Sequence, residues 1–152
     1  MSSKKKSTLR INFKKLNEHA KLPTKGSLEA ACFDVYAASV KVERPNKMTV
    51  GLGFATEIPA GYKGVIVPRS GLSKHNWILS NSIGIIDSDY RGEWMAVFRC
   101  LDEMVYNPLP FGVGDRCAQI YFEKIEDVTF IETDELSDTE RGEGGFGSTG
   151  KN

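Results

Sequence analysis

Residues 81–99 read NSIGIIDSDYRGEWMAVFR, and this stretch predicts the class of fold. Two runs rich in β-branched and aromatic residues, 84–86 and 94–99, flank a turn signal at 87–92. Residues 81–92 have the character of a β-hairpin. Because the stretch shows no long apolar period of 3.6 residues, it predicts strands and tight turns rather than a helix.

The same pattern of short β-rich runs continues in both directions along the chain. Further strands are predicted at residues 9–13, 33–37, 48–54, 64–68, 117–122 and 128–132. Turn signals separate them at 45–46, 59–61 and 108–114, and the one exception is a turn or two of helix at 71–75. Many short strands at regular spacing predict an all-β sandwich or barrel, such as a jelly roll.

Composition narrows the class of protein further. The 152 residues suit one domain with a hydrophobic core, and 20 Lys and Arg balance 20 Asp and Glu at a net charge of zero. That balance argues against nucleic acid as the main partner, and no apolar run reaches membrane-spanning length. Three cysteines in apolar contexts indicate reduced thiols, which predicts a cytoplasmic location, or a nuclear one if the source is eukaryotic or viral.

The chain divides into three predicted parts. Residues 1–10 are a flexible basic tail, residues 11–133 form the core, and residues 134–152 form a C-terminal arm that is acidic at first and rich in glycine at its end. We find no internal repeat and no linker that would split the core.

Residues 141–150, RGEGGFGSTG, combine five glycines with an arginine, two hydroxyls and one aromatic ring. Glycine allows positive φ and leaves backbone N–H groups open, and successive N–H groups form an anion nest. Arg141 adds a fork suited to phosphate, Ser148 and Thr149 add hydroxyl donors, and Phe146 can stack on a flat ring. We interpret this segment as a flap over a phosphorylated, ring-bearing small molecule. The alternative is a disordered glycine-rich tail.

Two carboxylates stand beside apolar runs. Asp34 lies within FDVYA, where it must face solvent, meet a cation or accept hydrogen bonds, and a solvated Asp34 is the simplest interpretation of that run alone. Asp87 follows an apolar run and precedes a turn, so it is a candidate general base, with an Asx-turn as the alternative. Asp89 is the competing carboxylate in the same turn. Gly84 lets a ligand or another backbone approach closely.

Two further segments place cations at strand ends. Residues 68–73, PRSGLS, offer a charge, a hydroxyl and open amides at Arg69, Ser70 and Gly71, which suits phosphate; alternatively, Ser70 caps a short helix. In GDRCAQIYF, residues 114–122, strand alternation puts Cys117 and Gln119 on one face and Arg116 on the other. For Arg116 we favour a buried bridge to a carboxylate.

In this order, the segments resemble the five motifs of the homotrimeric dUTP pyrophosphatases (dUTPases). The resemblance runs from about residue 11 to the end, with motifs at 30–37, 68–73, 84–93, 114–120 and 141–150. Cys32 stands where the family usually has glycine. The resemblance implies a distorted jelly-roll β-barrel and a homotrimer. Its active sites would lie between subunits, with each C-terminal arm swapped onto a neighbour.

The resemblance also implies a reaction and residue roles. The family hydrolyses dUTP to dUMP and pyrophosphate with Mg²⁺, which keeps uracil out of DNA and supplies dUMP for thymidylate synthesis. Asp87 would be the catalytic base, and Asp34 would hold Mg²⁺ through water. The expected substrate contacts are Arg69, Ser70, Gly71 and Gln119 for the phosphates, Asn81, Gly84, Ile85, Ile86, Tyr90 and Met95 for the uracil and deoxyribose, and Arg141, Phe146, Gly147, Ser148 and Thr149 for the closing arm.

Two other functions are compatible with the same segments. One is a dCTP deaminase of the same fold group, which the uracil-fitting segment and the aromatic-bearing tail disfavour. The other is a regulatory protein in which the order of the arm reports bound nucleotide, and this could coexist with catalysis.

Overall fold

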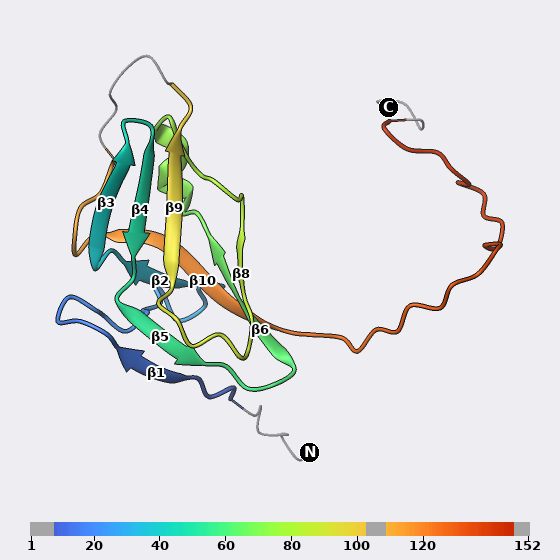
Figure 1. The fold of residues 1–152 in the computed structure, drawn as a ribbon, viewed down its shortest axis with the longest axis horizontal. Coiled ribbons are helices and arrows are strands. Elements are labelled where there is room, and N and C mark those ends of the chain that lie inside the picture. The colour runs from blue at the N-terminus through green and yellow to red at the C-terminus, as the bar shows by residue number, and fades with distance from the viewer. Residues whose placement is uncertain (1–7, 103–108, 148–152) are drawn as a thin grey trace.

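Strands make up nearly all of the regular structure in the computed structural model, which describes residues 8–102 and 109–147 (Figure 1). One short 3-10 helix, η1 (Ser70–Lys74), follows the sixth strand and matches the helical turn predicted at 71–75. The strands are β1 (Asn12–Lys15), β2 (Phe33–Tyr36), β3 (Ser39–Arg44), β4 (Lys47–Gly51), β5 (Phe54–Glu57), β6 (Tyr62–Val67), β7 (Trp77–Leu79), β8 (Gly84–Ile86), β9 (Met95–Cys100) and β10 (Arg116–Lys124).

Two four-stranded antiparallel sheets, ordered β2-β10-β6-β8 and β3-β4-β9-β7, enclose one core, and β1 and β5 form a separate ribbon. Phe54, Trp94 and Phe98 are among the largest fully buried side chains. The Phe54 ring stacks between Phe13 and Trp94 at centroid distances of 4.7 and 5.5 Å, which packs the ribbon against the sheets. The all-β, jelly-roll class predicted from the sequence is confirmed.

The predicted hairpin at residues 81–92 is wrong. β8 pairs with β6, whereas β9 pairs with β4 and β7, so the intervening residues carry the chain from one sheet to the other. The end of this connection is bound elsewhere: the Trp94 N–H donates to the Phe54 carbonyl, and the Leu52 N–H donates to the Trp94 carbonyl. A local turn signal indicates that the chain changes direction, but it does not indicate with which strand the next segment will pair.

Other strand predictions were also corrected. The run 48–54 is two strands, because Gly53 adopts φ 72° between β4 and β5. β3 was missed because it is mostly exposed and lacks a buried apolar face, and the three-residue strand β7 was missed as well. Residues 128–132 form no strand; Phe130 is 95% exposed there, and no other described strand pairs with the segment.

The chain beyond β10 runs away from the two sheets as an extended arm (Figure 1). Val128, Phe130, Ile131 and Leu136 are all exposed along it. In residues 8–102 and 109–147, no helix is long and apolar enough to cross a membrane. The three-part division remains a prediction, because residues 1–7 and 148–152 lie outside the described ranges.

Candidate active site

Asp34 is buried, with 4% of its surface exposed, and three donors converge on its carboxylate. Arg69 Nε donates to Oδ1 at 3.1 Å and Gln119 Nε2 donates to the same oxygen at 3.2 Å. Arg116 Nη1 approaches Oδ2 at 3.5 Å. The solvated interpretation of Asp34 is therefore wrong. The predicted bridge between Arg116 and a carboxylate is present but is buried only at its carboxylate end, because the Arg116 side chain is 52% exposed. Two guanidinium groups offset the cost of burying this charge.

A β-bulge brings Arg116 and Gln119 to the same carboxylate. In a regular strand, residues three apart point to opposite faces, as the sequence pattern predicted. The register between β10 and β2 shifts between Arg116 and Ala118, so Cys117 is the extra residue and the alternation changes phase there. Cys117 is buried, and this burial raises the pKa of its thiol to about 12.

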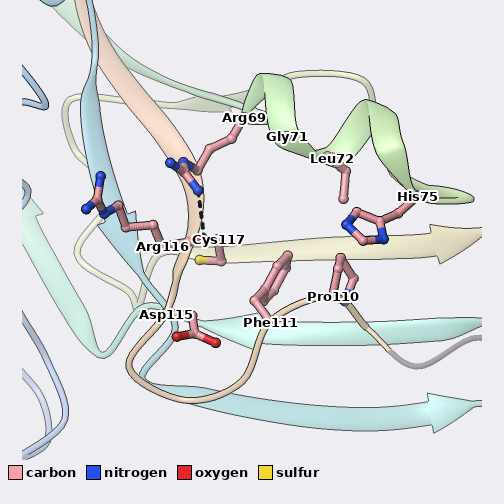
Figure 2. Close-up of a pocket in the computed structure, with 9 residues that line it drawn as sticks. All are labelled: Arg69, Gly71, Leu72, His75, Pro110, Phe111, Asp115, Arg116 and Cys117. Atoms are coloured by element: carbon pink, nitrogen blue, oxygen red, sulfur yellow. Dashed lines mark hydrogen bonds between the residues drawn. The ribbon is translucent and has the colours of Figure 1, made fainter.

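A cavity of about 470 Å³ lies beside this cluster (Figure 2). Arg69, Gly71 and Arg116 are part of its lining. Sequence reasoning missed the rest of its lining, because no pattern marked these positions as ligand contacts. They are Leu72, His75, Pro110, Phe111, Asp115 and Cys117, and His75 faces Pro110 and Phe111 across the cavity.

Ser70 does not cap η1. The residue before the helix is Arg69, which makes no side-chain capping bond, and Ser70 is itself the first helical residue, with an exposed side chain. Its carbonyl accepts the Ser73 hydroxyl at 2.6 Å. A Cβ placed on Gly71 would meet no atom within 4 Å among the described residues, so packing within this chain does not require glycine there.

A second cavity of about 280 Å³ brings together three predicted contacts, Asn81, Gly84 and Met95. Its remaining lining is Ile66, Leu79, Ser80 and Val97. Ile85 and Ile86 are not part of this lining among the described residues. The volume is at the small end for ligand pockets, which suits a single flat ring.

Asp87 is exposed, directly after β8. Its backbone carbonyl accepts the Tyr90 N–H at 3.2 Å, which closes the turn. Across residues 8–102 and 109–147, no hydrogen bond or ion pair engages its carboxylate, so the Asx-turn alternative is not supported. The Tyr90 hydroxyl donates to the Glu93 carbonyl at 3.1 Å, and a Cβ on Gly92 would collide with the Tyr90 ring.

The sheet register separates Ser70 from Asp87. Val67 at the end of β6 lies opposite Gln119, whereas Gly64 near its start lies opposite Ile86. Ser70 follows one end of β6, whereas Asp87 directly follows Ile86 and so lies near the other end. At about 3.3 Å per residue, the three-residue offset between Val67 and Gly64 is roughly 10 Å along this strand.

The described part of the arm forms local turns. Arg141 Nε donates to the Gly144 carbonyl at 2.9 Å, and the Gly144 N–H donates back to the Arg141 carbonyl at 3.0 Å. Gly147 has φ 83°, and the Phe146 side chain is fully exposed. Neither Phe146 nor Gly147 lines either cavity in this chain. The predicted contacts Ser148 and Thr149 lie outside the described residues.

The comparisons with known proteins by sequence and by structure agree with each other. The family model for dUTPase matches residues 18–150. The deoxyuridine 5'-triphosphate nucleotidohydrolase of Yarrowia lipolytica is 43% identical over 148 residues, covering 95% of this chain and 90% of the relative. That of Nautilia profundicola is 41% identical over 145 residues, covering 94% and 100%. A solved mutant dUTPase of Staphylococcus bacteriophage 80alpha with dUpNHpp superposes with a TM-score of 0.80 at 25% identity, covering 94% and 99%.

Proposed function

The chain belongs to the dUTPase family and hydrolyses dUTP, and we propose that it does so with Mg²⁺, yielding dUMP and pyrophosphate. This reaction would keep uracil out of DNA and supply dUMP for thymidylate synthesis. One structural observation carries the proposal. Side chains from three separate motifs, Asp34, Arg69 and Gln119, meet beside a cavity large enough for a polyphosphate.

The cluster at Asp34 suits the phosphate end of the substrate. The side chains of Arg69 and Arg116 are 35% and 52% exposed, so both keep donors available to a ligand while bound to Asp34. Arg69, with the exposed Ser70 and Gly71, would hold the α- and β-phosphates, and Gln119 would hold a further oxygen or water. Arg116 would act mainly as the structural partner of Asp34.

Asp34 fits an ion that arrives with the triphosphate. Mg²⁺ keeps most of its waters and is usually held by one or two carboxylates plus substrate phosphates. The described ranges contain no group of three or more His, Cys, Asp or Glu that could cage a metal. A carboxylate has about four acceptor positions, and the three donors leave one for a metal-bound water. When bound, Mg²⁺ would neutralise charge that develops on the pyrophosphate leaving group.

The smaller cavity suits uracil. Asn81, with backbone groups near Gly84, Ile85 and Ile86, would pair with the uracil edge, and Met95 would line the pocket. Cytosine would leave donors unpaired, at about 1–3 kcal/mol each. The Tyr90 ring would pack on the deoxyribose and exclude a ribose 2′-hydroxyl.

Asp87 would orient and deprotonate the water that attacks the α-phosphorus, and would accept a hydrogen bond from the sugar 3′-hydroxyl. Its exposed carboxylate, without a partner in the described chain, is free for this role. Proton transfer requires the base, the water and the α-phosphate to be in contact. The strand positions that precede Ser70 and Asp87 are offset by roughly 10 Å along β6, which is too large for one chain to complete the site.

This geometry supports a homotrimer with active sites shared between subunits. The exposed apolar residues Val128, Phe130 and Ile131 would pack against a neighbouring copy, so that the arm is swapped between subunits. Arg141, Gly147, Ser148 and Thr149 would then close over the γ-phosphate, while Phe146 covers the uracil. Cys32 and Cys117 form no disulfide among the described residues, which supports a cytoplasmic or nuclear setting.

The test is pyrophosphate release from dUTP with Mg²⁺. Asp87→Asn should abolish turnover while a non-hydrolysable dUTP analogue still binds, and Asp89→Asn, in the same turn, should retain turnover. Wild-type protein that binds the analogue but releases no pyrophosphate would refute the function. Turnover by Asp87→Asn would refute the assignment of the base.

A further inference from the structure

Arg91 ties the turn that carries Asp87 to a neighbouring strand. Its Nη1 donates to the carbonyls of Ser88 at 2.7 Å and Tyr90 at 3.3 Å, both within the turn. The same nitrogen lies 3.5 Å from the Thr56 carbonyl on β5, and Nη2 lies 3.7 Å from Glu57 Oε1. One side chain therefore bridges two points on the turn and two on β5.

Two other contacts support this bridge. Glu57 Oε2 accepts from Asn12 Nδ2 at 2.6 Å, which links Glu57 to β1. At the far end of the turn, Glu93 Oε1 accepts the Gly53 N–H at 2.8 Å. The turn is thus held at both ends against the bend and strand formed by residues 53–57. Because the Asp87 carboxylate has no partner of its own in the described chain, its place depends on how well the turn is held.

We propose that Arg91 is a positioning residue for the catalytic base. The inference rests on the proposed function, because it assumes that Asp87 must meet the attacking water at a defined place. The Arg91 side chain is 54% exposed, so its hydrogen bonds compete with water and contribute little to global stability. Fixing two carbonyls of a short turn nevertheless restricts where Asp87 lies, and a displacement of about 1 Å can cost on the order of 100-fold in rate.

The bridge uses the geometry of arginine. A planar guanidinium can reach acceptors on the turn and on β5 at the same time, whereas lysine presents a single point charge on a flexible stem. None of the predicted phosphate contacts, Arg69, Ser70, Gly71 or Gln119, shares a hydrogen bond with Arg91 in the described structure. Loss of Arg91 should therefore reduce kcat far more than substrate affinity.

The experiment compares wild type, Arg91→Ala, Arg91→Lys and a control, Arg99→Ala, which removes an exposed arginine on β9 outside the turn. For each we would measure kcat and KM for dUTP, the Kd of a non-hydrolysable dUTP analogue, and Tm. We expect Arg91→Ala to lower kcat by roughly 10- to 100-fold, with Kd within about threefold of wild type and Tm nearly unchanged. The kcat of Arg91→Lys should lie between those of wild type and Arg91→Ala, and the kcat of Arg99→Ala should match wild type.

The failures are distinguishable. If wild type itself releases no pyrophosphate, the proposed function fails. If wild type is active, a folded Arg91→Ala with wild-type kcat overturns the positioning role, as does a variant whose loss lies entirely in KM and Kd. Should Arg91→Ala not fold, Arg91→Lys decides: a wild-type kcat overturns the inference, and a kcat reduced by threefold or more at unchanged Kd supports it.

Discussion

Replacing Asp34 with asparagine tests the charge cluster at the centre of the site. The change keeps the shape of the side chain but removes its charge and one acceptor oxygen. Arg69 and Gln119 now share Oδ1, at 3.1 and 3.2 Å, and Arg116 faces Oδ2 at 3.5 Å. Whichever way the new amide is oriented, its NH₂ group faces at least one of these donors. At least one guanidinium therefore loses its acceptor.

The magnitude follows from burial. Breaking a fully buried ion pair costs about 3–5 kcal/mol. Here only the carboxylate is buried, at 6% side-chain exposure, whereas Arg69 and Arg116 are 35% and 52% exposed and can turn to water. We therefore expect a loss of roughly 1–3 kcal/mol in unfolding free energy. For a chain of this length, that lowers Tm by about 2–12 °C.

The assay is thermal unfolding by calorimetry, with wild type and variant at the same protein concentration so that any assembly contributes equally. Asp89→Asn is the matched control, because it makes the same substitution at an exposed carboxylate. A Tm for Asp34→Asn indistinguishable from that of the control would show that the cluster does not stabilise the fold, and the electrostatic account of the site would be abandoned.

Four other outcomes are expected. Cys117, with its pKa raised from 9.0 to about 12, should resist alkylation in the folded protein at pH 8 while Cys32 reacts, as measured by peptide mass spectrometry. Because the raised pKa lies in the folded state, its stabilisation is complete below pH 9 and is lost between about pH 9 and 12, so Cys117→Ala should show a shallower fall in Tm over that window. Gly92→Ala should displace the Tyr90 ring and reduce the ratio of kcat/KM for dUTP over UTP by about tenfold. Removing residues 141–152 should lower kcat sharply in the pyrophosphate assay. Full activity of the truncated protein would refute the proposed closure of the arm over the substrate.

Local patterns were sufficient to locate most strands. β2, β6, β8, β9 and β10 were predicted to within a few residues, because alternating apolar positions and nearby turn residues specify extended chain locally. Pairing was not predictable in the same way. Among the described strands, β3 and β4 are the only consecutive ones that lie side by side, and every other neighbouring pair is separated in sequence by at least one further strand.

For the candidate site too, the sequence predicts one part and only the tertiary structure decides the other. Its chemistry was readable in the sequence, because carboxylates, guanidinium groups, hydroxyls and glycines carry their reactivity wherever they stand. The tertiary structure alone decided that Asp34 is buried, since its donors come from 35 to 85 positions away. The bulge at Cys117 places Arg116 on the same face of β10 as Gln119. The strand register places Ser70 and Asp87 apart. Propensity acts over a few neighbouring residues, whereas burial and hydrogen-bond partners depend on which distant segments the closed core brings together.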